Sequence, residues 1–264
     1  MDIIQRNFFR LLRHGAFGQR EPIEPMSEWK WKSLYQVAQI HGVTPWIADG
    51  IMRQTDDFFQ NLSPALRQQF LDDTTERSER YGHPQLTNPL LNRKLKQWAE
   101  TAGQDNPTYR LLLTMTAISH NILTQGISLR QLITLGTYLR NTRDPLDYDL
   151  LRGWIRQLHM QRMARLEGSM LNELFHFSTE EIRFADVTEG SSSRRVVADI
   201  FQKTEKKAAD WYFTQGTSIF VRTSDSAAMM WHVRHSLSYL HYYPREAVTN
   251  FAANLAHSLS HIEE

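Results

Sequence analysis

Three prolines between residues 44 and 89 each follow a residue that can precede or cap a helix, in the pairs Thr44-Pro45, Ser63-Pro64 and Asn88-Pro89. After each pair, apolar residues recur every three or four positions, which is the period of an α-helix. Proline is favoured at a first helical position because it lacks an N–H and its φ is already helical. Helices joined by short loops are therefore predicted along this part of the chain.

Glycine and proline are scarce, with 12 glycines and 9 prolines in 264 residues, about 8% against a usual ~12%. Few tight turns are therefore available, which argues against an all-β fold. We expect a mainly α, multi-helix globular bundle with at most one short β-hairpin or strand. The segment TSIFVRT, residues 217–223, is the strand candidate.

The helical pattern divides into three regions that we expect to pack as one domain. Residues 1–105 form an N-terminal helical region, and residues 106–185 form a central helical core that is richer in leucine, isoleucine and aromatic residues. Residues 186–264 form a C-terminal helical region. The stretch 178–195 contains Gly190 and three consecutive serines and is predicted to be a long loop or hinge.

The N-terminal segment is amphipathic at helical spacing, and Gly15 stands where a C-terminal cap is expected. Its apolar face has Ile4, Phe8 and Leu11, and its other face has Arg6, Arg10 and Arg13. We expect this helix to pack on its own domain. Because the polar face is basic, binding to a membrane surface is the alternative. No apolar run approaches the roughly 20 residues that span a bilayer, and no membrane partner is expected.

Composition narrows the classes of function. The formal net charge is +1, so no global field draws the molecule to nucleic acid. We do not expect that partner unless a local patch provides the charge. The absence of cysteine excludes a thiolate nucleophile, disulfides and cysteine-ligated metals, and it suits the cytoplasm.

The most enzyme-like feature is the Asp-x-Asp pair Asp147 and Asp149 in RNTRDPLDYDLLRGW. Nucleotidyl transfer uses paired carboxylates to hold Mg²⁺ ions. Both side chains of such a pair share one side of a strand, but they lie about 200° apart on a helix. Pro145, a possible cap at Asp144 and the helical period of the following residues predict a helix start rather than a metal site.

Histidines near the C-terminus form a second set of candidates. Their spacings of three and four residues can place two imidazoles on one metal ion. The metal candidates are His232, His235, His257 and His261, with His241 between the pairs. No glutamate accompanies them in the zinc-protease pattern. We therefore expect surface or half-buried histidines, no metal and no cofactor.

Basic residues occur in three clusters, which are candidates for phosphate contact. They are Arg152, Arg156, Arg162 and Arg165; Arg194 and Arg195; and Lys203, Lys206 and Lys207. Acidic residues nearby favour solvated helix faces over a nucleic-acid footprint. The sequence has no P-loop, no Rossmann glycine pattern, no Gly-x-Ser-x-Gly elbow and no kinase signature.

Three segments resemble an uncharacterised nucleotidyltransferase family of Bacteroides-like bacteria. They are FFRLLRHGAFG with WKSLYQVAQIHGVTPWIADGI, then GISLRQLITLGTYLRNTRDPLDYDLLRGWIRQLHM, then HSLSYLHYYPREA. The family carries a catalytic core, with a Lys-Gly turn and an Asp-x-Asp on a strand, between the first two segments. Here LTNPLLNRKLKQWAETAGQDNPTYRLLLTM connects them almost directly. The resemblance therefore implies a helical remnant without that core, and no catalytic residue carries over.

We accordingly expect a noncatalytic binding or scaffolding module whose partner is another protein, such as a full-length nucleotidyltransferase. An enzyme with a site built from dispersed residues such as Asp147, Asp149 and the neighbouring arginines is one alternative. A phosphate- or nucleic-acid-binding protein is the other.

Overall fold

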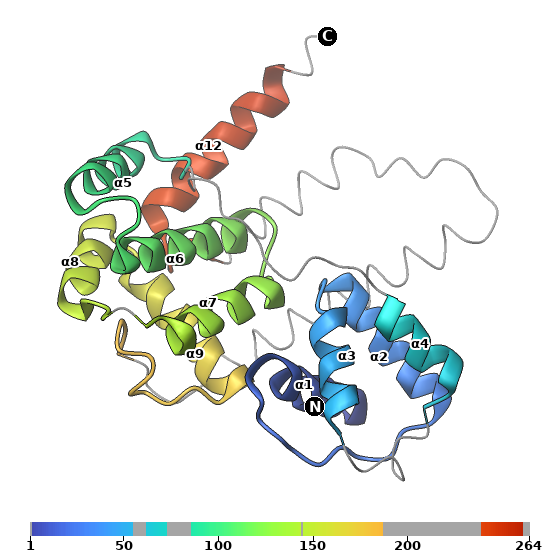
Figure 1. Ribbon diagram of the computed structural model, residues 1–264. Coiled ribbons are helices and arrows are strands. Elements are labelled where there is room, and N and C mark those ends of the chain that lie inside the picture. Colours follow the sequence, from blue (N-terminus) through green and yellow to red (C-terminus); the bar gives the residue numbers. More distant parts are fainter. Residues whose placement is uncertain (1, 55–61, 73–85, 144, 187–238, 261–264) are drawn as a thin grey trace. The chain divides into compact units, whose positions relative to one another are not determined.

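All regular secondary structure in the described residues is α-helical, which confirms the mainly α prediction. The computed structural model describes residues 2–54, 62–72, 86–143, 145–186 and 239–260, without the side chains of 254–260 (Figure 1). The strand candidate at 217–223 lies outside these residues.

The chain forms two compact units that interleave along the sequence. The first contains residues 1–79, 129–137 and 197–217, and the second contains 80–128, 138–196 and 218–264. Helix α7 (Leu129–Asn141) begins in the first unit and ends in the second. The three regions expected from the sequence, and their packing as one domain, stay a prediction.

The first unit contains α1 (Ile3–Phe17), α2 (Glu28–Ile40), α3 (Thr44–Arg53) and α4 (Pro64–Asp72). Helix α3 contacts the other three. Pro45 lies in the first turn of α3 and Pro64 begins α4, as their sequence positions predicted.

Helices α1 and α3 cross at two glycines. A Cβ on Gly15 would lie 1.7 Å from the carbonyl oxygen of Trp46, and one on Gly50 would lie 2.2 Å from that of Leu11. The prediction that Gly15 caps α1 was wrong, because the helix continues to Phe17 and Gly18 caps it at φ 71°. Gly15 instead allows the two backbones to touch.

The basic face of α1 is paired within the protein. The Arg6 guanidinium binds both oxygens of Glu24 at 2.7 Å, and Arg13 binds both oxygens of Glu21. Arg10 also contacts Glu24, at 2.9 Å. The apolar face is buried, with Phe8, Phe9, Leu11 and Leu12 at most 2% exposed. Helix α1 therefore packs on its own unit, as expected, and its Phe8 and Phe9 are not available to a membrane surface.

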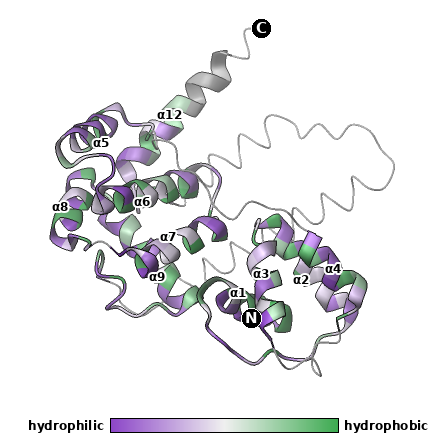
Figure 2. Cartoon of the chain, viewed as in Figure 1, coloured by the Kyte–Doolittle hydropathy of each residue, from purple (hydrophilic) through white to green (hydrophobic). Residues whose placement is uncertain are grey.

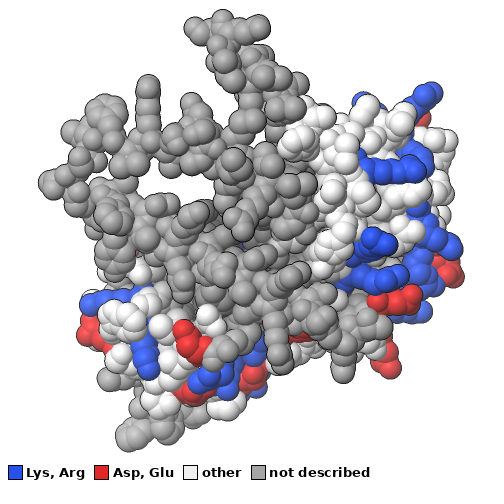
Figure 3. Space-filling model, turned by 180° about the vertical axis from the view of Figure 1, so that it is seen from behind, with Lys and Arg blue, Asp and Glu red and all other residues white. Residues whose placement is uncertain are grey.

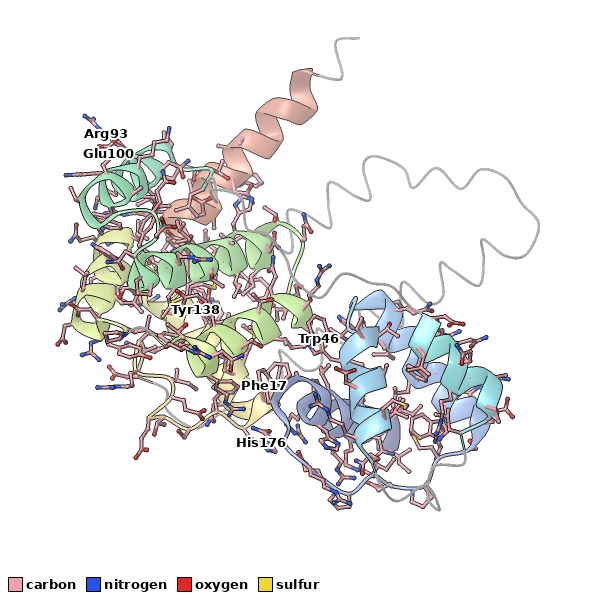
Figure 4. All side chains as sticks on the ribbon, viewed as in Figure 1. Phe17, Trp46, Arg93, Glu100, Tyr138 and His176 are labelled. Carbon is pink, nitrogen blue, oxygen red and sulfur yellow. The ribbon has the colours of Figure 1, made fainter. Side chains whose placement is uncertain are left out.

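The second unit is built around α6 (Pro107–Thr124), which is buried along most of its length. Around it lie α5 (Pro89–Ala102), α8 (Tyr148–Leu158), α9 (Gln161–Phe175) and α12 (Pro244–Ser260), each in contact with α6. The outer helices carry hydrophobic and hydrophilic residues on different sides (Figure 2). On α5, for example, the exposed Arg93 and Glu100 lie on the outer side (Figure 4). None of the described helices is long and apolar enough to cross a membrane.

Asp147 is the N-cap of α8, and its carboxylate accepts a hydrogen bond from Leu150 N at 2.9 Å. The predicted helix start is confirmed, three residues later than a cap at Asp144 would place it. Asp144 itself lies outside the described residues. Asp149 is in the first turn with its side chain 93% exposed and pairs with Arg152 at 2.6 Å.

Candidate anion-binding pocket

A cavity of about 230 Å³ lies where α8, α9 and residues 184–186 meet. Its polar lining includes three arginines, one glutamine and one aspartate, and its apolar lining includes Ile155, Ala164 and Phe184. The polar residues are Arg152, Arg156, Gln161, Arg165 and Asp186. The volume is below the roughly 300–1,000 Å³ of pockets for drug-sized ligands, so the cavity suits a small group.

The position of α8 is set by its apolar side. Trp154 stacks on Trp98 of α5 with ring centroids 5.4 Å apart, and its edge meets Tyr109 of α6 at 6.1 Å. The Tyr109 hydroxyl, in turn, donates to Leu95 O of α5 at 2.9 Å. Since this side of α8 is fixed against two helices, Arg152 and Arg156 lie on the side away from the core.

The segment after α9 is also held in place. Arg140, at the end of α7, binds Glu181 at 2.8 Å and lies 3.8 Å over the ring of Phe177. Arg152 donates to Arg183 O at 2.9 Å, and Phe184 is 2% exposed. The third wall of the pocket is therefore anchored at several points.

The three pocket arginines differ in what they bind. Arg152 is committed to Asp149 and to Arg183 O. Arg156 and Arg165 are exposed and form no ion pair with any residue that the structure describes. Asp186 is the one carboxylate among the lining residues. The lining thus carries a formal charge of +2, with two guanidinium groups available to a ligand.

The pocket also lies at the first turn of α9. Gln161 is the first residue of that helix, and Met160 at the N-cap position has a side chain that cannot cap it. The first N–H groups of a helix and its dipole favour an anion. Two available guanidinium groups and a helix start without a side-chain cap give the same preference for negative charge.

A second polar group lies inside the same unit but is closed to ligands. Glu167 of α9 is fully buried and accepts a hydrogen bond from Ser119 Oγ at 2.8 Å. Burial raises the pKa of this carboxyl well above its usual value. A raised carboxyl pKa can mark a catalytic acid. With no exposed surface, however, Glu167 has no contact with a substrate in solution.

Glu246 of α12 is also buried, and its side chain connects α12 to α5 and α6. Its carboxylate accepts backbone N–H bonds from Thr87 and Asn88 at the start of α5, and it lies 3.5 Å from His120 Nδ1 of α6. Tyr243 is buried beside it, and the pKa of its phenol is raised by burial and by the charges of Glu246 and Glu167. These contacts fix the start of α12, which is a structural role.

The residues that the sequence suggested for metal or phosphate binding lie in different places in the structure. Asp147 and Asp149 lie at an exposed helix start, and neither lines the pocket. His241 is exposed in the turn before α12, and no group of three or more His, Asp or Glu in the described part of the chain could hold a metal ion. The other candidates have side chains outside the described residues: His232, His235, His257, His261, Arg194, Arg195, Lys203, Lys206 and Lys207.

Arg152, Arg156 and Arg165 are the candidates that the structure brings together. Arg162, from the same sequence cluster, does not line the pocket and donates to His241 O at 3.1 Å. The sequence shows this cluster of arginines, but which of them can bind a ligand depends on the residues that each one contacts in the fold. Phe184 and Asp186, which complete the site, had no distinguishing sequence signal.

Comparison with protein-family models, with curated proteins and with solved structures finds no match to this chain.

Proposed function

We propose that this protein is a noncatalytic, helical binding protein that holds a phosphate-type anionic group in the pocket between α8 and α9. The observation that carries the proposal is the pair Arg156, in the last turn of α8, and Arg165 of α9, which line one pocket without an ionic partner in the described residues. A guanidinium group matches the geometry of a phosphate or carboxylate through two parallel hydrogen bonds.

The size of the cavity favours a single anionic group over a whole nucleotide. About 230 Å³ is enough for several waters at ~30 Å³ each and therefore for a phosphoryl group with a short attachment. Ile155 and Ala164 provide an apolar floor for that attachment, and Asp186 provides an acceptor for a hydroxyl or amine beside the anion.

The carboxylates near the pocket support a noncatalytic role. Asp147 is used as a helix cap, and Asp149 points into solvent against Arg152. Glu167, the carboxyl whose pKa is raised by burial, is inaccessible. A two-metal transferase needs two carboxylates that converge on a bound phosphate, and none of these three lines the pocket.

The wider setting of the proposal comes from the sequence. It includes descent from the helical parts of a nucleotidyltransferase, a protein partner such as a full-length nucleotidyltransferase, and a place in the cytoplasm. The proposal would lose its noncatalytic part if the purified protein transferred a nucleotide from a Mg²⁺-bound nucleoside triphosphate and lost this activity in Asp147→Ala.

The pocket is tested by calorimetric titration of the full chain with inorganic pyrophosphate at constant low ionic strength. We expect the double variant Arg156→Gln/Arg165→Gln to bind at least tenfold more weakly, since each hydrogen bond to a charged group contributes about 1.5–3 kcal/mol. Arg110→Gln is the matched control, because Arg110 is exposed on α6 and does not line the pocket. Equal affinity of the double variant and the wild type would contradict the assignment.

A further inference from the structure

The polar side of α8 carries one continuous stripe along the helix. Tyr148, Arg152, Arg156 and His159 follow one another at intervals of four, four and three residues. At 100° per residue these four positions fall within about 80° of the helix circumference. Arg152 and Arg156, in the middle of the stripe, line the pocket, whereas Tyr148 and His159 lie outside it.

Helix α9 adds Arg162 and Arg165 beside this stripe, and both are exposed. We call Arg152, Arg156, His159, Arg162 and Arg165 together the basic track. Burial, followed by the charges of Arg245 of α12 and Lys94 of α5, lowers the pKa of His159, so the positive charge of the track comes from its four arginines. In the view from behind, Lys and Arg side chains lie among Asp and Glu side chains on the described surface of the second unit (Figure 3).

Each end of the basic track has at least one aromatic ring. At one end the guanidinium of Arg183 lies 5.0 Å over the ring of Tyr148. At the other end the rings of His241 and Tyr242 lie 3.7 Å apart, and Arg162 holds the backbone of that turn through His241 O. Aromatic rings and guanidinium planes are the surfaces on which unpaired bases stack.

We propose that the basic track binds a short stretch of single-stranded nucleic acid, with one phosphate in the pocket between α8 and α9 and bases stacked at the two ends. This inference rests on the proposed function, because the pocket takes one phosphate of the strand. Helix α8 has 11 residues and is therefore about 16 Å long. At roughly 3.4 Å per phosphate along a stacked strand, that length corresponds to about five nucleotides.

Two features favour nucleic acid over an acidic protein segment. Positive groups recur along α8 and continue onto the start of α9, as the phosphates of a strand do, and aromatic rings stand at the two ends. An acidic peptide would use the arginines but would gain little from His241 and Tyr242. The net charge of +1 does not exclude a local basic surface, because it is a sum over surfaces of both signs.

The test measures fluorescence anisotropy of labelled ten-nucleotide oligothymidylate with the full chain over a series of salt concentrations. Each phosphate contact contributes a slope of about −0.7 in log K against log salt for single strands. With Arg156, Arg162 and Arg165 as the phosphate contacts we expect a slope near −2, and a slope less steep by about 1.4 in Arg156→Gln/Arg165→Gln. Arg110→Gln is again the control and should change neither affinity nor slope.

A second variant separates base stacking from charge. Tyr242→Leu keeps an apolar side chain but removes the ring, and we expect about tenfold weaker binding of the oligonucleotide. Pyrophosphate affinity should stay unchanged in this variant, since Tyr242 does not line the pocket. If the substitution instead disrupted the fold, the affinities for the oligonucleotide and for pyrophosphate would fall together, and circular dichroism would show the loss of helix.

The outcomes distinguish the two proposals. If pyrophosphate binds but the oligonucleotide binds no more tightly, the pocket assignment stands and the nucleic-acid inference fails. If neither binds, both fail. If an oligoglutamate of the same charge binds as tightly as the oligonucleotide, with no effect of Tyr242→Leu, the partner is an acidic segment and the nucleic-acid inference is overturned.

Discussion

Glu167 shows how one side chain can couple stability to pH. In the folded protein its carboxyl is fully buried, with a single hydrogen bond from Ser119 at 2.8 Å, and burial raises its pKa well above the ordinary 4.5. In the unfolded chain the same carboxyl ionises near its ordinary value. As pH rises above 4.5 the unfolded state therefore loses its proton first, and the folded state becomes relatively less stable.

We expect Glu167→Gln to remove this pH dependence. The amide keeps an oxygen for Ser119 and has no proton to lose, so the variant should gain stability over the wild type as pH rises from 4.5 to 8. The gain is about 1.4 kcal/mol per pH unit up to the pKa of the folded carboxyl. Urea unfolding at pH 4.5, 6 and 8 measures it.

Glu100→Gln is the control for this measurement, because Glu100 is exposed on α5 (Figure 4). Its stability should stay within about 0.5 kcal/mol of the wild type at each pH, as is usual for an exposed substitution. If the difference between Glu167→Gln and the wild type were equally constant, the buried carboxyl would not be the titrating group.

At the scale of elements, the close crossing of α1 and α3 depends on the absence of a side chain at Gly15. In Gly15→Ala the new Cβ would lie 1.7 Å from Trp46 O, a backbone atom that cannot rotate away. We expect a loss of about 1–3 kcal/mol in unfolding free energy from overpacking, even though alanine is the better helix former.

Gly153→Ala on α8 is the matched comparison. Gly153 is also inside a helix, but a Cβ there meets nothing within 4 Å. We expect this variant to gain about 0.5–1 kcal/mol from helix propensity alone. Chemical unfolding of both variants checks the pair. Equal effects of the two substitutions would show that the helix crossing does not distinguish them.

Helix starts set by local residues could be predicted from the sequence, whereas the role of Gly15 could not. The cap at Asn88 and the prolines Pro45 and Pro64 act locally, so their helix starts were predictable. The helix start near Asp147 was predicted by the same reasoning, although the cap is Asp147 itself. Gly15 was mistaken for a cap because its role depends on α3, about 30 residues later in the chain.

Across the molecule, ion pairing in the fold determines which basic side chains are available to a ligand, and composition does not show it. The arginines of α1 and those of α8 look alike in the sequence, since both recur on one helical face. Those of α1 are bound by Glu21 and Glu24, whereas Arg156 and Arg165 have no such partner in the part of the chain that the structure describes. Only the fold shows which basic face is available, so the candidate site could be predicted as residues but not as a pocket.

The same ion pairs determine how the molecule responds to acid. The hydrogen bond from Arg6, followed by the charges of Arg6 and Arg10, lowers the pKa of Glu24 to about 2 from an ordinary 4.5. The hydrogen bond from Arg140 likewise lowers the pKa of Glu181. For carboxyls with depressed pKa values, the stabilisation is complete above the unfolded value. It is lost as pH falls toward the folded one. We therefore expect unfolding free energy to fall between pH 4.5 and 2.

Glu24→Gln isolates one of these contributions. Its amide cannot form the charge-assisted pair with Arg6 and Arg10, so the variant should be less stable than the wild type at pH 5–7, and the gap should close as pH approaches 2. Urea unfolding followed by circular dichroism at pH 7, 5, 4, 3 and 2 measures that gap. Glu28→Gln removes an exposed charge in the first turn of α2 and its pair with Lys32 one helical turn away, and it should change stability by less than about 1 kcal/mol. A gap for Glu24→Gln that persisted unchanged at pH 2 would mean that packing of the 18–27 segment, rather than its charge, holds it against α1.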